Sequence, residues 1–411
     1  MKAVLPVAGN GTRMAPIGVT TPKALIPVLN KPLIEWTLEA LAENGIDEVI
    51  VITSAGKFGS MIRDHVEKLQ DGRYPFKISI VVQEQQLGTA HVVQMAKDFF
   101  SEEEEFIHLY GDDLYGSGNI AEVKNAVGLA VVGKEVTDPE KWGIFATNED
   151  NNLVSVVEKP SEYVGNLANI GCMKLSGKVF KLYDSLQISV RGEYEITDSL
   201  QLLAQEQPIR VIPASDYWIP IGYPWHILEA VDQLLPLREA KVEGDVAETS
   251  TLNGNVTLPK SSKILPGCYL EGNILIGENV TIGPNARIRG NTVLGNDVLI
   301  GFGVDIARSV IGARTHVAHL AYIGDSILGE DCNVSGGCVV ANFRHDARVI
   351  QTPVKGVMTS TGRSKFGAVL GNGVRLGVNT SIYPGRKIWP GLTTKPGQVV
   401  DRDLSDISTN S

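Results

Sequence analysis

The chain has 411 residues, of which 43% are hydrophobic and 20% charged, and its formal net charge is −10. This length favours two domains, and the acidic balance argues against general binding to nucleic acid or to an anionic membrane. With no apolar run long enough to cross a bilayer and no signal-peptide core, a cytoplasmic protein is expected. The four cysteines form no C-x-x-C pair and are expected to be buried and reduced: Cys172, Cys268, Cys332 and Cys338.

Up to about residue 235, apolar runs of strand length alternate with helical patterns. The predicted strands are residues 3–7, 48–53, 78–82 and 106–110, and residues 32–43 are a predicted helix that Gly45 would end. Buried strands separated by helices indicate an α/β fold with a Rossmann-like, mixed but mostly parallel sheet. Ligands of such sheets bind beyond the carboxyl ends of the strands.

The first predicted strand is followed by A-G-N-G-T-R at residues 8–13. Gly9 and Gly11 let the backbone turn tightly and bring amide hydrogens close to a bulky anion. Arg13 and Lys23 add two cations that can neutralise a polyphosphate. No Gly-Lys-Ser/Thr follows, and the third glycine of a dinucleotide fingerprint is missing. The stretch therefore predicts a different kind of phosphate-binding corner, or else an ordinary strand–turn–helix corner with surface charges.

From about residue 245 an aliphatic residue recurs at every sixth position. The longest unbroken series is Ile276, Ile282, Ile288, Leu294, Ile300 and Ile306, and further series follow after changes of phase. Such hexapeptide repeats predict a left-handed parallel β-helix, hereafter the prism, with one short strand and one turn in each repeat. Residues 341–366 lack the period and are predicted to leave the prism as a loop. The predicted divisions are residues 1–235, the prism at 236–400 and a C-terminal tail at 401–411.

The motifs of the first half resemble those of the sugar-1-phosphate nucleotidylyltransferases. The resemblance depends on G-x-G-T-R followed by T-P-K-A-L-I-P-V, on Q-E-Q-Q-L-G-T-A at residues 83–90 and on Y-G-D at residues 110–112. It implies transfer of a nucleotidyl group from UTP or dTTP to a sugar-1-phosphate, with release of pyrophosphate. N-acetylglucosamine-1-phosphate and glucose-1-phosphate are the leading acceptors, and neither the nucleotide nor the sugar is decided by the sequence.

The same resemblance implies a set of site residues. Arg13, Lys23 and Asp112 would be catalytic, with Mg²⁺ held on Asp112. The implied nucleotide-binding residues are Ala8, Gly9, Gly11, Thr12, Gln83, Gly88, Thr89 and Tyr110. The implied sugar-phosphate-binding residues are Gly143, Glu158, Lys159 and Asn169. The Gln83 amide can pair with the N3–H and a carbonyl of uracil or thymine, and it does not distinguish the two bases.

Two prolines occupy unusual positions in this half of the chain. Many relatives have W-x-D-I-G near the end of this domain, where the aspartate helps to hold the metal, whereas this chain has Pro220 at that position. Asp113, Asp216, water or phosphate oxygens would then complete the metal shell, or metal binding is weakened. Pro6 is unusual within a central strand. A catalytically silent protein that binds nucleotide sugars is therefore an alternative to an enzyme.

The second half resembles the acetyltransferase half of the bifunctional uridylyltransferases/glucosamine-1-phosphate acetyltransferases of bacteria and archaea. The resemblance depends on H-L-A-Y-I-G-D at residues 319–325, on Asn333 and Asn342, and on Lys365. It implies that His319 is the general base that takes a proton from a sugar amine as the amine attacks acetyl-CoA. Tyr322, Asn333 and Lys365 would bind the sugar phosphate or the acetyl group.

Two positions of the prism depart from that pattern, Ser335 in place of glycine and Phe343 in place of tyrosine. A purely structural prism is therefore the alternative to an acetyltransferase. Prisms of this kind commonly associate as trimers, so a homotrimer is expected.

Overall fold

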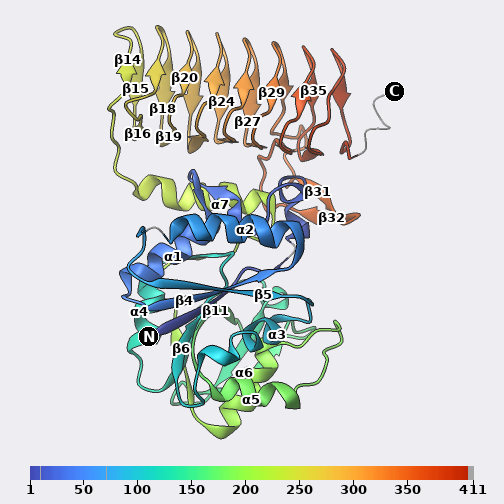
Figure 1. The fold of residues 1–411 in the computed structure, drawn as a ribbon. Coiled ribbons are helices and arrows are strands. Elements are labelled where there is room, and N and C mark those ends of the chain that lie inside the picture. Colours follow the sequence, from blue (N-terminus) through green and yellow to red (C-terminus); the bar gives the residue numbers. More distant parts are fainter. Residues whose placement is uncertain (10, 71, 406–411) are drawn as a thin grey trace. The chain divides into compact units, whose positions relative to one another are not determined.

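The computed structural model of the chain describes residues 1–9, 11–70 and 72–405 (Figure 1). The described residues form two compact units. Residues 1–9, 22–25 and 32–220 belong to the first unit, and residues 11–21, 26–31 and 221–405 belong to the second. Residues 221–235 thus group with the prism, whereas the sequence assigned them to the first domain.

A nine-stranded sheet forms the centre of the first unit, in the order β10-β9-β11-β6-β1-β4-β5, with β8 beside β11 and β12 beside β8. Its strands are β1 (Lys2–Pro6), β4 (Glu48–Ser54), β5 (Lys77–Gln83), β6 (Glu105–His108), β8 (Leu129–Glu135), β9 (Gly143–Thr147), β10 (Leu153–Glu158), β11 (Leu167–Ser176) and β12 (Ile209–Pro213). The strands β6, β1, β4 and β5 are mutually parallel, as predicted. The long strand β11 runs antiparallel to β6, β8 and β9 and makes the sheet mixed.

Helices cover both faces of this sheet (Figure 1). They are α1 (Leu33–Glu43), α2 (Gly56–Leu69), α3 (Thr89–Gln94), α4 (Ser117–Asn125), α5 (Lys178–Leu182) and α6 (Ile196–Glu206). Because successive side chains of a strand point to opposite faces, Leu5 packs in the same core as α1, α2 and α4, and Val4 packs in the core that contains residues of α3, α5 and α6. Pro6 is the last residue of β1, a position that a central strand tolerates.

Several short elements complete the first half of the chain. The strand pair β7 (Leu114–Tyr115) and β13 (Trp218–Ile219) is antiparallel. The strands β2 (Pro27–Val28) and β3 (Lys31–Pro32) precede α1 in the sequence. Single 3-10 turns are η1 (Thr12–Met14), η2 (Ile17–Val19), η3 (Lys23–Leu25), η4 (Lys97–Phe99), η5 (Pro139–Lys141), η6 (Tyr183–Ser185) and η7 (Leu235–Leu237).

The second unit contains the predicted prism, built from three parallel sheets. The first sheet is β14 (Asp245–Val246), β17 (Lys263–Ile264), β20 (Thr281–Ile282), β23 (Leu299–Ile300), β26 (His316–Val317), β29 (Asn333–Val334) and β34 (Arg375–Leu376). The second is β15 (Thr251–Asn253), β18 (Tyr269–Glu271), β21 (Arg287–Arg289), β24 (Asp305–Ala307), β27 (Tyr322–Gly324), β30 (Val339–Val340), β35 (Ser381–Ile382) and β37 (Val399–Val400). The third is β16 (Val256–Thr257), β19 (Ile274–Ile276), β22 (Thr292–Leu294), β25 (Val310–Ile311), β28 (Ile327–Leu328), β33 (Ala368–Leu370) and β36 (Arg386–Ile388).

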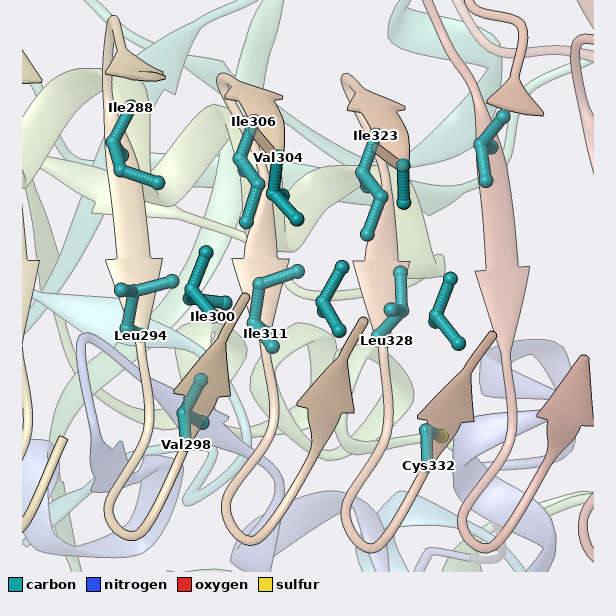
Figure 2. Close-up of a cluster of buried hydrophobic side chains, with 14 of the residues drawn as sticks. Ile288, Leu294, Val298, Ile300, Val304, Ile306, Ile311, Ile323, Leu328 and Cys332 are labelled. Carbon is teal, nitrogen blue, oxygen red and sulfur yellow. The ribbon is translucent and has the colours of Figure 1, made fainter. Parts of the chain in front are cut away.

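The six-residue period predicts the prism interior. Figure 2 shows Ile288, Leu294, Ile300 and Ile306 stacked inside the coils, and each is fully buried. A coil spans 18 residues at first, as between Asn279 and Asp297, and the phase changes of the sequence mark later coils that are one residue shorter. Helix α7 (Pro224–Leu234) also belongs to this unit.

Residues 341–366, hereafter the prism loop, leave the coils as predicted. They contain an antiparallel hairpin of β31 (Gln351–Val354) and β32 (Val357–Ser360). An antiparallel bridge between Phe343 and Lys365 closes the loop at its stem. Of the predicted tail, residues 401–405 lie along the last coil, where Leu404 bridges Ile388, and residues 406–411 lie outside the described residues.

All four cysteines are free and buried, as expected. Among the described residues, no helix combines the length and the apolar character that crossing a membrane requires.

Candidate functional site

A cavity of about 330 Å³ lies at the carboxyl ends of β1, β5 and β6, where the sequence predicted a ligand site. We call it the sheet-edge cavity. Its lining residues are Pro6, Ala8, Gly9, Gln83, Gln86, Gly88, Thr89, Val92, Tyr110, Asp112 and Glu193. Six of the eight residues proposed to bind nucleotide are among them, whereas Gly11 and Thr12 are not. The cavity therefore brings together four segments that are far apart in the sequence.

Gln83, the last residue of β5, presents a polar group to this cavity. Its side chain is 1% exposed, and its Nε2 lies 2.7 Å from His91 Nδ1. Burial lowers the pKa of His91, so the ring is neutral at neutral pH and its Nδ1 accepts the Gln83 N–H. Gln83 Oε1 is buried and has no hydrogen-bond partner among the described residues. A ligand N–H would satisfy this oxygen.

Gly88 packs closely against the segment that contains Tyr194. Its φ is +112°, and a Cβ at this position would lie 2.4 Å from the carbonyl oxygen of Tyr194. The Tyr194 amide donates to the Leu87 carbonyl at 2.8 Å, and the Ala90 amide donates to the Tyr194 carbonyl at 2.9 Å. The contact excludes any side chain at Gly88 and fixes the loop that leads into α3.

A lysine and two aspartates meet beside the cavity. Lys23 Nζ lies 2.8 Å from Asp112 Oδ2 and 3.5 Å from Asp113 Oδ1. Trp218 Nε1 donates to Asp113 Oδ2 at 3.3 Å. The structure therefore joins Lys23 to Asp112, two of the residues predicted to be catalytic.

Arg13 lies on η1 and groups with the second unit. Its guanidinium carbon is 5.2 Å from the centre of the Tyr223 ring, within the range of a cation–π interaction. Arg13 is not one of the residues that line the sheet-edge cavity. Its role as a catalytic cation stays a prediction.

The proline that departs from the family pattern lies close to Asp113 in the strand register. Trp218 pairs with Tyr115 and Ile219 with Leu114, so Pro220 and Asp113 are the next positions of this antiparallel pair. Asp216, a candidate to replace the missing ligand, instead accepts hydrogen bonds from the amides of Gly118 and Tyr217. Its carboxylate therefore serves the start of α4.

The donor set at Asp112 matches what Mg²⁺ needs from a protein. Among the described residues, no group of three or more histidine, cysteine or acidic side chains is placed to hold a metal. Mg²⁺ usually takes only one or two carboxylates and completes its shell with phosphate oxygens and water. Asp112, with Asp113 beside it, fits that share.

The predicted sugar-phosphate residues form a second group, on β9, β10 and β11. A Cβ on Gly143 would lie 2.9 Å from Glu158 Oε2, 3.2 Å from Thr197 Cγ2 and 3.8 Å from Asn169 Cβ. We call these four residues the β9–β11 cluster. Burial raises the pKa of Glu158. The cluster thus offers a carboxylate, an amide and a hydroxyl around a position without a side chain, which is a suitable surface for sugar hydroxyls.

Two cations border Glu158 in this cluster. Lys159 Nζ lies 3.6 Å from Glu158 Oε1, and Arg191 NH2 lies 3.4 Å from the same oxygen. Arg191 also pairs with the buried Glu195 at 2.7 Å. Sequence reasoning did not select Arg191, because none of the motifs quoted above includes it. The pair of cations supplies positive charge suited to a sugar phosphate.

His319 lies at a corner of the prism, between β26 and β27, and is exposed. A Cβ on Gly336, in the next coil, would lie only 2.5 Å from His319 Nε2. The glycine therefore leaves room for the imidazole ring. Asn333 lies on β29 in the first sheet of the prism, where it pairs with His316 and Arg375, whereas Tyr322 lies on β27 in the second sheet.

Tyr322 and Lys365 both lie next to Asn342. A Cβ on Gly324 would lie 2.6 Å from the Tyr322 hydroxyl and 2.5 Å from Asn342 Nδ2, so the two side chains share one space. The Lys365–Phe343 bridge directly follows Asn342. Asn342 also donates to Asp325, which is 1% exposed.

Arg308 is a further residue that sequence reasoning missed in the prism. Its guanidinium binds both carboxylate oxygens of Asp325 at 2.7 Å. This bidentate ion pair fixes the carboxylate to which Asn342 donates. Asp325 ends the H-L-A-Y-I-G-D string, but no motif included Arg308. The arginine and the aspartate, 17 residues apart, become neighbours only once the coil is formed.

A second cavity, of about 520 Å³, lies at the stem of the prism loop, and we call it the loop cavity. Its lining residues are Ala341, Phe343, Arg344, His345, Asp346, Tyr383, Pro384, Arg386 and Asp401. Of these, sequence reasoning named only Phe343. The missing period of residues 341–366 was the one signal that this part of the prism is special.

The chain matches the family described as "Nucleotidyl transferase" over residues 2–236 and that described as "GMPPB C-terminal domain" over residues 270–390. It is 37% identical to the "Bifunctional sugar-1-phosphate nucleotidylyltransferase/acetyltransferase" of Sulfurisphaera tokodaii, over 98% of both chains. It is 35% identical to "Bifunctional protein GlmU" of Methanococcus vannielii, over 98% of this chain and 96% of the relative. Among solved structures, "UDP-glucose pyrophosphorylase complexed with UDP-glucose" shares the fold of 58% of this chain and 99% of its own, with a TM-score of 0.51 at 24% identity.

Proposed function

The chain belongs to the nucleotidyl transferase family and, within it, to the bifunctional sugar-1-phosphate nucleotidylyltransferases/acetyltransferases, and from this premise we propose two activities. The first unit transfers a nucleotidyl group from UTP or dTTP to a sugar-1-phosphate. The prism acetylates the amine of an amino-sugar-1-phosphate with acetyl-CoA.

One observation supports the first activity above all others: six of the eight residues proposed for the nucleotide, together with Asp112, line the sheet-edge cavity. The unpartnered Gln83 Oε1 supports a base with an imide N–H, as uracil and thymine have and cytosine lacks. The cavity lies at the carboxyl ends of parallel strands, as nucleotide sites of such sheets do.

In the proposed reaction a phosphate oxygen of the sugar-1-phosphate attacks the α-phosphorus of the nucleoside triphosphate. A new P–O bond forms, the bond between the α-phosphorus and its bridging oxygen breaks, and pyrophosphate leaves. Gln83 and Gly88 orient the nucleoside, while Glu158 and Asn169 hold the sugar. Lys23 and Arg13 neutralise charge on the phosphates. In transfers of this kind, catalysis depends almost entirely on positioning the reactants and on stabilising the charge of the transition state.

Asp112 would hold Mg²⁺, with Asp113 beside it, and the ion would draw charge from the phosphate oxygens as a Lewis acid. Pro220 removes one carboxylate of the family pattern. We expect the site to depend more strongly on phosphate oxygens for its metal shell, and therefore to bind Mg²⁺ weakly until nucleotide is present.

For the second activity, the nitrogen of the sugar amine forms a bond to the acetyl carbon of acetyl-CoA. The carbon–sulfur bond breaks, the thiol of coenzyme A leaves, and His319 accepts the proton of the amine. The exposed ring of His319 at a prism corner supports this role. So does the space beside Gly324 that the Tyr322 hydroxyl and the Asn342 amide share. Arg344 and Arg386 on the loop cavity offer charge suited to the phosphates of coenzyme A.

We further propose that the prism associates with copies of itself as a trimer. Large apolar side chains are exposed on it, with Phe302 48%, Leu320 61%, Phe343 49% and Tyr383 54% exposed. Burial of these side chains against another chain would remove apolar surface from water. A second copy of the same chain is the occupant that the family's prisms suggest.

A matrix of pyrophosphate-release assays tests the first activity, with UTP and dTTP each against glucose-1-phosphate, galactose-1-phosphate, N-acetylglucosamine-1-phosphate and glucosamine-1-phosphate. We expect turnover with at least one pair. Binding of UDP- or dTDP-sugar without pyrophosphate release from any pair would identify the silent binding protein instead. Thiol release from acetyl-CoA with glucosamine-1-phosphate tests the second activity separately.

A further inference from the structure

Lys387 is a buried lysine on the outer side of the prism. Its neighbour on β36, Ile388, packs in the prism core, so Lys387 points away from that core. It is nevertheless 4% exposed. Its Nζ donates to the carbonyl of Pro353 in the prism loop, and it lies 3.6 Å from Asp403 Oδ2. A lysine is rarely buried this deeply unless partners hold its charge.

The neighbours of Lys387 contact the same two segments. Arg386 NH2 donates to the Gln351 carbonyl at 3.2 Å, and a Cβ on Gly385 would lie 2.7 Å from Ile350 Cγ2. On the other side, the Lys387 amide donates to Asp403 Oδ1 at 3.0 Å, and the Leu404 amide donates to the Lys387 carbonyl. The strand therefore holds the prism-loop hairpin on one side and residues 403–404 on the other.

The prism loop has a second attachment within the same unit. Arg363, near its end, pairs with Asp232 of α7 at 3.1 Å. Between these attachments the loop returns to its stem at the Phe343–Lys365 bridge. Residues 343–346 of the prism loop line the loop cavity, and so does Arg386 of the strand that carries Lys387. The position of the loop on this strand therefore affects the shape of the cavity.

We propose that Lys387 is a positioning residue of the acetyl-transfer site: by binding the Pro353 carbonyl and Asp403, it fixes the prism loop so that the loop cavity fits an acyl-CoA thioester. The inference rests on the proposed acetyl transfer. Lys387 itself touches no substrate in this account. It acts through the loop that carries Phe343 and Lys365.

The experiment compares the full-length variants Lys387→Met and Lys395→Met. Methionine keeps most of the length of the side chain and removes the charge, and Lys395 is an exposed lysine of the same prism. For Lys387→Met we expect trypsin to cut the prism loop about 5-fold faster or more, since cleavage follows the open population of the segment. We also expect the KM for acetyl-CoA to rise about 5- to 10-fold while kcat changes less than about 2-fold. Nucleotidyl transfer should stay unchanged, and Lys395→Met should match the wild type in every assay.

Equal cleavage rates in the two variants would overturn the proposal, and so would a loosened loop with an unchanged KM for acetyl-CoA. If Lys387→Met does not fold, Asp403→Asn replaces it, because it removes the ion pair and leaves the bond to Pro353. It should raise the cleavage rate and the KM in the same direction by a smaller factor, and no change in either would contradict the proposal. A wild-type protein that transfers no acetyl group would refute the proposed activity, while the cleavage comparison would still show whether Lys387 holds the loop.

Discussion

Lys23 Nζ lies 2.8 Å from Asp112 Oδ2, so the cation predicted to neutralise phosphate is paired with the carboxylate predicted to hold the metal. The pair keeps both charges beside the sheet-edge cavity without leaving either unbalanced. When a polyphosphate and a divalent ion enter together, each can take over one partner of the pair, so the exchange conserves charge.

Replacing Lys23 with methionine should therefore lower kcat/KM for pyrophosphate release about 10²- to 10³-fold, the usual cost of removing one fixed charge from such a transition state. Lys57→Met, at an exposed position of α2, is the matched control and should change nothing. A Lys23 variant that retains wild-type kcat/KM would remove this residue from the proposed machinery.

A second prediction concerns Gly88. In Gly88→Ala the new Cβ would meet the Tyr194 carbonyl oxygen at 2.4 Å in addition to the strain of a positive φ. We expect nucleotide affinity, measured by calorimetry, to fall about 10-fold or more as the loop shifts. Gly128→Ala is the control, because Gly128 has a φ of +68° and open space where the Cβ would lie. It should cost about 1–2 kcal/mol of stability through backbone strain alone and leave affinity intact.

A third prediction concerns the loss of stability below neutral pH. Burial lowers the pKa of His108 from 6.5 to about 4, and its Nδ1 bonds the Gly171 carbonyl at 3.1 Å. The unfolded chain binds a proton below about pH 6.5 and the folded chain only near pH 4, so stability falls as the pH falls through this window. Between pH 7 and pH 5 the loss from this group is about 2 kcal/mol.

Urea unfolding at the two pH values measures this loss. His108→Asn should lack it, whereas His345→Asn, at an exposed position of the prism loop, should keep the full wild-type pH dependence. Equal acid sensitivity of wild type and His108→Asn would show that other groups cause the effect.

The fourth prediction separates the two activities. His319→Ala should lower the rate of thiol release from acetyl-CoA about 10²- to 10⁴-fold, the range for loss of a general base, and leave pyrophosphate release unchanged. His316→Ala changes a histidine of the same prism that lies on β26 and is the control. An unchanged rate of thiol release in His319→Ala would show that His319 is not the general base.

The prism could be predicted from the sequence because its period is local. Ile288, Ile300 and Ile306 are fully buried as the six-residue rule requires, and even the changes of phase correspond to shorter coils. Gln83 and Asp112 could be selected because they belong to motifs that resemble the family. Gln83 ends β5 and Asp112 follows β6, and the topology of the parallel sheet places both beside one cavity. Their binding roles remain predictions.

Other parts of the structure depend on contacts that no local pattern encodes. The position of Arg191 depends on ion pairs with Glu158 and Glu195, which are far apart in the sequence. Most of the antiparallel pairing in the sheet involves β11, whose pairing with three strands is set by tertiary packing. Residues 11–21 group with the second unit for the same reason, although in sequence they begin only a few residues after β1.

The bridge between Phe343 and Lys365 means that the prism loop leaves the coils and returns to them at neighbouring points. Val340 still pairs with Ile382, as it would in coils without an insertion. The repeat on either side is thereby insulated from whatever is inserted between these two residues. Residues can be added to this segment or removed from it at a small entropic cost, while the rest of the scaffold keeps its spacing.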